Sequence, residues 1–522
     1  MNNSRKSIFI PSIADIVFLS VFLLLSFSAG KGLLADCDTG YHIRAGEFIL
    51  DTFSIPKQDI FSFLSPPLYW TAHEWLSEVI MALLHRAFGM TGVVIFFSFI
   101  IAAVYYLLLR GIQTYKGNIF LTLLVVLLVV GASQIHWLAR PHIFSLFLVV
   151  IWYYLLDSYQ YRDKNHLYLL PLIMLLWVNL HGGFIAAFIL SGIYLFYNIA
   201  RLFISQGEEK ADYKKKAKIL GAATFACLLV SLINPYGYHI LLFPFRLTSD
   251  RILMDNVLEF LSPNFHEPLI FKYLLLSAIA VLALSGKRLN LIELGLILLF
   301  TYMSLYSARY IPLFGIIAAP ILTRQAEYML QSEGRLAGFF KKRAERISPI
   351  DASAKGYLWP FAAVLAVIIL AATGRVEYGF DEKIKPVAAV EFLKKERLDG
   401  NMFNSDEFGD YIIYSAYPQY KVFIDGRLDM YGSERIKEYF KVARIEAGLY
   451  DVLKKHNINW IIFDARSALS QFLIQRDDWK LIYADKVANI FLRNIPENRK
   501  LIEKYKSVRP ALEEKEKEPP GS

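Results

Sequence analysis

Long apolar runs recur along most of this chain and constrain its fold more than any other feature. Most runs span roughly 17–23 residues, which is enough for a helix to cross a hydrocarbon core of about 30 Å. Hydrophobic residues make up 55% of the chain and charged residues only 20%. A soluble protein of this length would carry more charge, and its apolar residues would be dispersed. The sequence therefore predicts an α-helical polytopic membrane protein.

We expect about eleven membrane-spanning helices. They are predicted near residues 13–34, 91–109, 118–135, 143–157, 167–180, 184–200, 218–233, 268–285, 290–307, 310–323 and 357–373. The segment 74–88 is amphipathic, and it either lies on the membrane interface or extends the second span. The first span is longer than the apolar core of a signal peptide and no small-residue cleavage site ends it. We therefore expect it to remain as an anchor.

Lysine and arginine concentrate in alternate loops, and this bias predicts the orientation. The basic loops lie at residues 5–6, 110–116, 162–164, 210–218, 287–288 and 339–346. By the positive-inside rule these loops are cytoplasmic, so the N-terminus is cytoplasmic and the C-terminal domain is extracytoplasmic. The net charge of +9 comes largely from these loops, so it does not indicate nucleic acid as a partner. We expect a multi-pass protein of the inner (plasma) membrane.

The hydrophobic pattern changes after the last predicted span. We expect a transmembrane module at residues 1–374 with an outer loop at 35–90, and a small extracytoplasmic α/β domain at 375–505. The predicted elements of that domain are a helix at 386–397 and strands near 401–404, 420–424, 459–464, 480–484 and 487–493. Residues 506–522 are charged and contain proline, so we expect a disordered tail.

The first long hydrophilic loop begins with Asp36 and Asp38. Carboxylates this close to a membrane surface are costly unless they are solvated, paired or used. In an extended segment residues i and i+2 face the same way, so both could bind one Mg²⁺ or Mn²⁺ ion, or act as base toward one substrate hydroxyl. The alternative is that one Asp caps a helix at 40–50. A cap accounts for one aspartate but not for both.

The same loop contains further polar candidates. His42 lies within one helical turn of Asp38, and His73 and Glu74 stand at the far end of the loop. His73 and Glu74 could close back over the aspartates and bind substrate. Alternatively, they form a polar cluster at the start of a helix.

Two arginines, Arg140 and Arg309, stand at predicted outer edges of spans. A guanidinium there suits a lipid phosphate because it is planar, permanently charged and multidentate. The alternative is that these side chains only reach toward water. Three more polar residues at span ends either line the same cavity or form turns. They are Asn179, His181 and Asn234.

In the predicted α/β domain, Asp425, Arg427 and Asp429 follow a predicted strand. Sites in open α/β sheets lie at the carboxyl ends of strands. The favoured interpretation is nevertheless an internal Asp–Arg pair that stabilises a loop.

The chain resembles the GT-C class of membrane glycosyltransferases, in which a first span leads directly to an acidic pair in a long outer loop. The resemblance covers the topology of about residues 8–373, and its specific part is the sequence DCDTGYHIRAGE at 36–47. The class includes protein O-mannosyltransferases, oligosaccharyltransferase catalytic subunits and aminoarabinose transferases. The sequences HEWLSE, ARPH, NLHGG, NPYG, SARYIPLF and FIDGRLDMYG also resemble uncharacterised bacterial multi-span relatives.

The resemblance implies an inverting glycosyltransferase that uses a sugar on polyprenyl phosphate or diphosphate, with a glycan, lipid or protein as acceptor. Asp36 or Asp38 would be the base, and Arg309 or Arg140 would lie near the lipid phosphate. The oligosaccharyltransferase motif WWDYG is absent, so transfer to peptide asparagine is not implied. The alternatives are a transporter or flippase for lipid-linked sugars and a non-catalytic envelope assembly protein. A transporter would have ionisable residues in mid-span and matching halves, and neither is evident.

Overall fold

The computed structural model describes residues 9–115, 117–330, 335–354 and 356–511. The chain divides into two compact units. The membrane unit comprises Met1–Leu33 and His73–Tyr378, and the loop–sheet unit comprises Leu34–Ala72 and Gly379–Ser522. The loop that begins with the two aspartates thus forms one unit with the C-terminal part of the chain.

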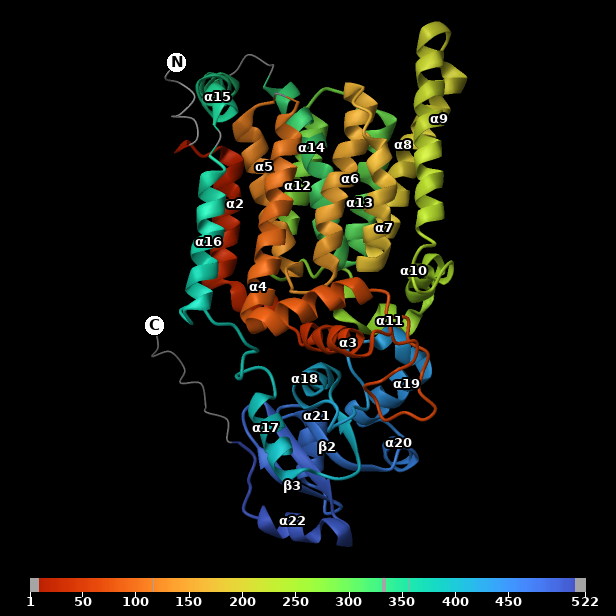
Figure 1. Cartoon of the computed structure of the whole chain (residues 1–522), viewed down its shortest axis with the longest axis vertical. Helices are drawn as coiled ribbons and strands as arrows, with labels where there is room; N and C mark the ends of the chain where they lie inside the picture. The colour runs from red at the N-terminus through yellow and green to blue at the C-terminus, as the bar shows by residue number, and fades with distance from the viewer. Residues whose placement is uncertain (1–8, 116, 331–334, 355, 512–522) are drawn as a thin grey trace. The chain divides into compact units, whose positions relative to one another are not determined.

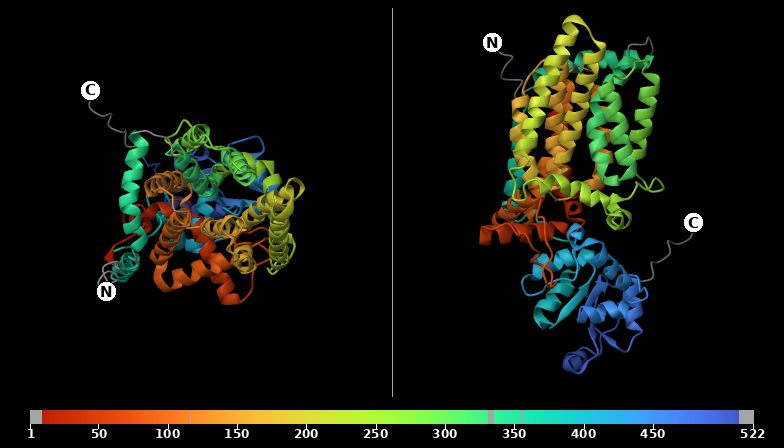
Figure 2. Two further views of the ribbon diagram at one scale, coloured as in Figure 1. Left: turned by 90° about the horizontal axis from the view of Figure 1, so that it is seen from above. Right: turned by 90° about the vertical axis from the view of Figure 1, so that its right-hand side faces the viewer.

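The membrane unit is a bundle of helices that run beside one another (Figure 1). Its long helices are α2 (Ile13–Leu23), α4 (Trp75–Gln113), α5 (Ile119–Ser133), α6 (His142–Arg162), α7 (Leu170–Leu180), α8 (Ile185–Ile204), α9 (Gly207–Val230), α12 (Phe271–Leu284), α13 (Leu291–Tyr306), α14 (Ile311–Met329), α15 (Arg335–Ser353) and α16 (Leu358–Ala372). Figure 2 shows the yellow α9 running alongside α8. Short helices α10 (His239–Ser249), α11 (Arg251–Asn256), η7 (Leu258–Phe260) and η8 (Ala308–Tyr310) connect the longer ones.

Each of the eleven predicted spans coincides with one of these helices. Within the described ranges, four helices are long and apolar enough to cross a membrane by themselves, namely Trp75–Gln113, Ile119–His136, His142–Arg162 and Gly182–Ile204. The bent pair Gly338–Ser353 and Leu358–Ala372 adds a fifth if it forms one span. The chain is therefore a multi-pass membrane protein, and the count of eleven crossings stays a prediction.

The amphipathic segment 74–88 is part of α4, so it is continuous with the second predicted span. The helix bends at Gly89, whose φ of 62° lies in the left-handed region. Glycine adopts this conformation without the steric cost that a Cβ would add. Residues 75–88 thus form a separate helical arm that meets the second predicted span at a kink and lies across the end of the bundle (Figure 1).

The loop–sheet unit has a four-stranded sheet in the order β1-β2-β4-β3. Strand β1 (Asn401–Asn404) pairs in parallel with β2 (Ile458–Asp464), and β4 (Ala488–Arg493) pairs antiparallel with β2 and with β3 (Trp479–Ala484). The helices are α3 (Asp38–Thr52), α17 (Val387–Glu396), α18 (Asp406–Ala416), α19 (Leu428–Ala443), α20 (Leu449–Lys455), α21 (Ala468–Ile474) and α22 (Arg499–Lys504). The predicted helix at 386–397 and four of the five predicted strands are confirmed.

The fifth predicted strand, at 420–424, is wrong. Its residue Val422 forms a single bridge to Ser62 of the outer loop. The Val422 N–H donates to the carbonyl of Phe61 at 3.0 Å, and Phe63 N–H donates to the carbonyl of Val422 at 3.3 Å. The apolar segment thus pairs with the outer loop instead of joining the sheet. The predicted disordered tail at 506–522 falls largely outside the described residues, because 512–522 are among those not described.

Candidate active site

The predicted site residues fall into two polar clusters, one in each unit. In the loop–sheet unit, Asp38 is the first residue of α3, and the N-cap position is taken by Cys37 without a side-chain hydrogen bond. Neither aspartate therefore caps the helix. The backbone of Cys37 is helical, with φ −93° and ψ −5°. The expectation that Asp36 and Asp38 alternate in an extended segment is therefore wrong, because the helix begins between them.

Asp38 instead contacts a residue from the C-terminal part of the chain. Its side chain shares a hydrogen bond with Asp410 of α18, whose Oδ1 also accepts a bond of 3.0 Å from Gly426 N–H. A Cβ on Gly426 would lie 2.6 Å from Oδ1 of Asp38 and 2.9 Å from Oδ2 of Asp410. Only glycine lets the backbone come this close. The two carboxyl groups are thus packed against one glycine.

One of these carboxyl groups must carry a proton, because two carboxylates cannot hydrogen-bond to each other. Burial of Asp410, together with the charges of Asp38 and Asp425, raises the pKa of Asp410 well above its ordinary value. Asp410 is 1% exposed, whereas Asp38 is only half-buried. Burial thus favours the protonated form of Asp410, and Asp38 is the more exposed carboxyl group of the pair. Sequence reasoning missed Asp410, because nothing in its own segment distinguishes it from a helix-surface acid.

The acidic cluster does not present a full ligand set for a divalent ion. Among the residues that the structure describes, no three His, Cys, Asp or Glu side chains are grouped so that they could bind one. Burial raises the pKa of Asp410, the partner of Asp38, well above its ordinary value and so disfavours its charged form. The Mg²⁺ or Mn²⁺ site expected at Asp36 and Asp38 stays a prediction, and no step below is routed through a metal.

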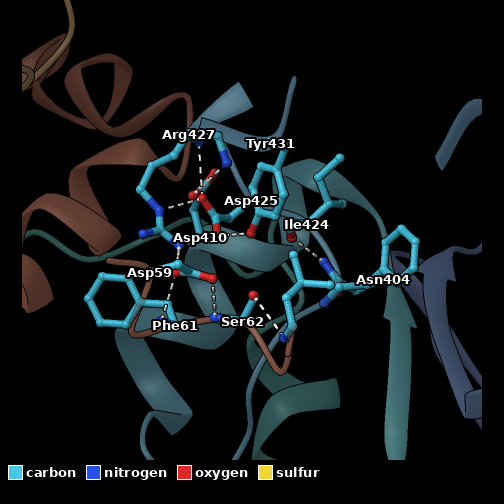
Figure 3. A network of polar contacts seen from close by, with 12 residues as sticks. Asp59, Phe61, Ser62, Asn404, Asp410, Ile424, Asp425, Arg427 and Tyr431 are labelled. Atoms are coloured by element: carbon cyan, nitrogen blue, oxygen red, sulfur yellow. Dashed lines mark hydrogen bonds and ion pairs between the residues drawn. The ribbon is translucent and has the colours of Figure 1, made fainter. Parts of the chain in front are cut away.

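A buried ion network stands beside this pair and is shown in Figure 3. Arg427 donates from Nε and Nη2 to the carboxylate of Asp425, at 2.8 and 2.7 Å, and from Nη2 to Asp59 at 2.9 Å. The Tyr431 hydroxyl donates to Asp425 at 2.6 Å. Burial alone would raise the pKa of Asp59, but Arg427 and local hydrogen bonds lower it below its ordinary value. The predicted internal Asp–Arg pair is confirmed.

The outer loop also supplies aromatic rings to this network. The Arg427 guanidinium lies 4.5 Å from the ring centre of Trp70 and 4.9 Å from that of Phe61. The turn formed by residues 425–427 thus holds the loop through Arg427 and contacts Asp38 through Gly426. His42 lies on the packed side of α3, where it is 1% exposed and its ring centre is 4.1 Å from that of Tyr41.

The membrane unit brings two other predicted residues onto one carboxylate. Oε1 of Glu74 lies 3.4 Å from Nε2 of His181 and 3.6 Å from Nε2 of His73. The other ring nitrogen of His181, Nδ1, accepts from Gly183 N–H at 2.9 Å and lies 2.7 Å from the Ser145 hydroxyl. Because Nδ1 accepts, the proton of His181 is on Nε2 and points to Glu74. Burial holds the pKa of His181 well below its ordinary value, so the imidazole is neutral.

The same unit places both predicted arginines beside an acid that sequence reasoning did not find. Arg140 Nη1 lies 3.0 Å from Oε1 of Glu259 in η7, and Oε2 of Glu259 lies 4.0 Å from Nε2 of His136. The Arg309 guanidinium stacks 4.7 Å from the ring centre of Phe260. Burial would raise the pKa of Glu259, but Arg140 and Arg309 together lower it far below its ordinary value. The available signal was a lone glutamate in the apolar stretch VLEFL.

The two asparagines at span ends have structural partners. Asn179 accepts from the indole N–H of Trp75 at 2.9 Å and donates to the carbonyl of Ile233 at 3.0 Å. Asn234 accepts from Tyr236 N–H at 2.7 Å within its own turn, as the turn interpretation predicts.

Comparison with known proteins gives matches in structure and none in sequence. No protein-family model and no curated protein matches the chain. The apo oligosaccharyltransferase of Archaeoglobus fulgidus matches with a TM-score of 0.52 and 12% identity, covering 93% of this chain and 74% of that one. ArnT from Cupriavidus metallidurans bound to undecaprenyl phosphate matches with a TM-score of 0.48 and 10% identity, covering 91% and 97%. Both are GT-C glycosyltransferases.

The chain has the GT-C fold. The resemblance stated from the sequence is therefore confirmed at the level of fold. At 12% identity the match says nothing about individual residues. Within this GT-C fold, the acidic pair and the arginine cluster must be interpreted from their own contacts.

Proposed function

We propose that the protein is a membrane glycosyltransferase that moves a sugar from a polyprenyl-phosphate-linked donor to an acceptor hydroxyl at the outer face of the membrane. The observation that carries this proposal is the Asp38–Asp410 pair, in which the half-buried Asp38 is packed with the buried Asp410 against Gly426. A fixed carboxylate that accepts a proton is the group a hydroxyl acceptor requires. The GT-C fold supports the reaction class.

In the proposed reaction Asp38 takes the proton of the acceptor hydroxyl. The hydroxyl oxygen attacks the anomeric carbon of the donor, and a bond forms between them. The bond from that carbon to the phosphate oxygen breaks, and the phosphate leaves with the electron pair. A single displacement inverts the anomeric configuration. Arg140 and Arg309 are assigned to the phosphate, whose negative charge grows as the bond breaks.

The remaining predicted residues are assigned to donor binding. Glu74 with His73 and His181 offers a carboxylate acceptor and two imidazoles, a set that can hydrogen-bond to sugar hydroxyls. Asp36 is assigned to the approach of the acceptor. His42 supports α3 from its packed side.

The test is cleavage of the donor by purified protein in lipid nanodiscs. Undecaprenyl-phosphate donors that carry labelled hexoses or pentoses are added with a membrane extract as the source of acceptor. We expect free undecaprenyl phosphate and a labelled acceptor to appear together from at least one donor. A flippase would relocate the donor intact, and a non-catalytic protein would do neither. If every donor remains uncleaved, the proposal fails.

We also propose that the loop–sheet unit is extracytoplasmic, as the lysine and arginine bias predicts. Both native cysteines are buried, so a new cysteine at the exposed position Ala468 can be labelled selectively. In intact cells an Ala468→Cys variant should react with a maleimide that does not cross membranes. Reaction only with a permeant maleimide would reverse the orientation.

A further inference from the structure

Helix α15 (Arg335–Ser353) lies across one end of the helical bundle in the membrane unit. Figure 1 shows this helix end-on, and Figure 2 shows it lengthwise at the end of the bundle. The next helix, α16 (Leu358–Ala372), packs beside α2 and α4, and α15 meets it at an angle of 66°. A helix that is turned this far from the bundle axis runs along a membrane surface rather than through the membrane.

One face of α15 attaches the helix to the bundle. Phe340, Ala344 and Asp351 lie on this face, spaced four and seven residues apart, and Ala344 and Asp351 are buried. The carbonyl of Phe340 accepts from the side-chain amide of Asn118, just before α5, at 3.2 Å. The carboxylate of Asp351 accepts from the N–H of Ile13, the first residue of α2, at 2.6 Å. Both halves of α15 are thus fixed to the bundle, and the opposite face is left for other contacts.

The exposed side chains of α15 are mainly basic and apolar. Between Gly338 and Ser353, Glu345 is the single exposed acid, whereas four exposed side chains are cations, namely Lys341, Lys342, Arg343 and Arg346. Phe339 and Ile350 are 50% and 49% exposed. The guanidinium of Arg343 lies 4.4 Å from the ring centre of Phe339, so a cation and an apolar ring share one position. Large apolar side chains flanked by Lys and Arg are typical of a helix that lies in the headgroup layer.

Two aromatic residues mark the level of the membrane surface next to α15. Tyr357 and Trp359, at the start of α16, are 56% and 46% exposed. Tyrosine and tryptophan are enriched where a membrane meets water. The indole N–H of Trp359 donates to the carbonyl of Phe9 at 3.0 Å, which holds the ring at this end of α16. Because α15 ends a few residues before these rings, it lies at the level of the lipid headgroups.

We propose that α15 is a binding surface for anionic lipid headgroups, in which its cations pair with lipid phosphates while Phe339 and Ile350 enter the boundary of the acyl chains. The negative potential of an anionic leaflet attracts basic segments at its surface. A neutral phospholipid offers the same apolar contact without that attraction, so the surface selects lipids by charge. The basic residues that predict the orientation of the chain thus gain a second role in the folded protein. This inference does not rest on the proposed function, because it uses none of the residues assigned to sugar transfer.

The test places a fluorescent probe on the exposed face of α15 in the full-length protein. Both native cysteines are buried, so an NBD group can be attached selectively to an Ile350→Cys variant. The protein is placed in nanodiscs that mix phosphatidylcholine with phosphatidylglycerol, and the acyl chains of one lipid at a time carry bromine as a quencher. We expect half-maximal quenching at a mole fraction of phosphatidylglycerol about fivefold lower than that of phosphatidylcholine. Fivefold is about the effect of one Lys or Arg near an anionic surface.

Charge variants then test whether the cations cause this preference. Arg343→Gln combined with Arg346→Gln removes two cations near Phe339, and the preference should fall to about one. Arg343→Lys combined with Arg346→Lys keeps the charge and should keep most of the preference. The matched control is Lys214→Gln combined with Lys215→Gln, two exposed lysines of α9, which should leave it unchanged. Added salt should weaken the preference of the parent protein, because salt screens exposed charges.

Three outcomes would overturn the inference. Equal quenching by the two brominated lipids would show apolar contact without recognition of charge. No quenching by either lipid would place this face of α15 in water, where its cations serve orientation or a soluble anionic partner. Loss of the preference in the lysine variants as well as in the glutamine variants would show that charge is not its cause.

Discussion

Arginine is used in opposite ways in the two units. In the loop–sheet unit Arg427 is 1% exposed in its side chain, pairs with both Asp59 and Asp425, and lies against two aromatic rings. In the membrane unit Arg140 pairs with Glu259 and Arg309 stacks on Phe260, and both arginines are only partly buried. A cation that is fully buried and paired by two acids is closed to a ligand from solvent. A partly exposed arginine remains within reach of an anion.

The carboxylates of the loop–sheet unit show the same division. Asp59 and Asp425 both accept hydrogen bonds from Arg427, so we assign them a structural role. Asp38 instead shares a hydrogen bond with Asp410, and its side chain is only half-buried. Under the proposed function, we assign a structural role to the Arg427 network and a role in the reaction to Asp38, Arg140 and Arg309. The following experiments test that assignment, beginning with the largest expected effect.

The first prediction is that Asp38→Asn lowers the rate of sugar transfer by about 10²–10⁴, the usual contribution of a general base. The substitution keeps the size of the side chain and removes the carboxylate that accepts the proton. Asp36→Asn should have a smaller effect, and Asp51→Asn, an exposed aspartate on the same helix, should have none. The measurement is donor cleavage at saturating donor, with protein levels matched. Full activity of Asp38→Asn would move the base elsewhere.

The second prediction concerns the network assigned to structure. Arg427→Met should lower the free energy of unfolding by about 3–5 kcal/mol, because it leaves Asp59 and Asp425 buried without a partner. Urea unfolding measures this loss, and trypsin cleavage at the exposed Lys57 reports release of the outer loop.

The matched control is Arg476→Met, since Arg476 pairs at the surface with Asp478 and such pairs contribute about 0–1 kcal/mol. If Arg427→Met instead loses activity while its unfolding curve and trypsin pattern match the wild type, Arg427 belongs to the chemistry and the division above is wrong.

The sequence predicted most of the local structure but only part of this division. Periodicity located the helices and four strands, and the composition of the first loop pointed to Asp38. The segment 420–424 reads as a strand because Val422 and its neighbours are apolar, yet its backbone pairs with Ser62. A periodic pattern of apolar residues indicates that a segment is buried, but it does not indicate which segment it pairs with.

Pairing between distant residues accounts for what the sequence did not reveal. Asp410 lies on a helix with several acids, and only the folded chain brings it onto Asp38. Glu259 looks like an isolated acid until the folded chain sets it against Arg140. By contrast, the bond between Asp425 and Arg427 is local, two residues apart, and was predicted. The contact between residues close together in the sequence was predicted, whereas the contacts between residues far apart in the sequence were not.

The third prediction addresses the arginines assigned to the ligand. Arg309→Ala should weaken retention of a polyprenyl-phosphate sugar by about ten- to a hundredfold, since hydrogen bonds to charged groups contribute about 1.5–3 kcal/mol. Arg309→Lys should weaken it less, because it keeps the charge but loses the planar group that stacks on Phe260.

Arg375→Ala is the control, because Arg375 is an exposed arginine of the same unit. Purified variants are washed and the retained lipid is measured by mass spectrometry. Retention by Arg309→Ala equal to that of the wild type would leave Arg140 as the sole candidate for the phosphate.

The smallest expected effect is on the pH dependence of stability, to which Asp410 and Asp59 of the loop–sheet unit contribute with opposite sign. The pKa of Asp410 is raised in the folded protein, so its contribution to stability is fully present below about pH 4, the ordinary pKa, and is lost as pH rises through the raised value. The pKa of Asp59 is lowered, so its contribution is present above about pH 4 and is lost as pH falls through the lowered value.

In Asp410→Asn the amide donates the same hydrogen bond without titrating. On the alkaline side the thermal midpoint of this variant should therefore fall less than that of the wild type. For one titrating group, the free energy of unfolding cannot change by more than about 1.4 kcal/mol per pH unit. Asp59→Asn should flatten only the acid side. If Asp410→Asn leaves the alkaline slope unchanged, Asp410 is already ionised near neutral pH, and Asp38 is not the carboxylate singled out to act as base.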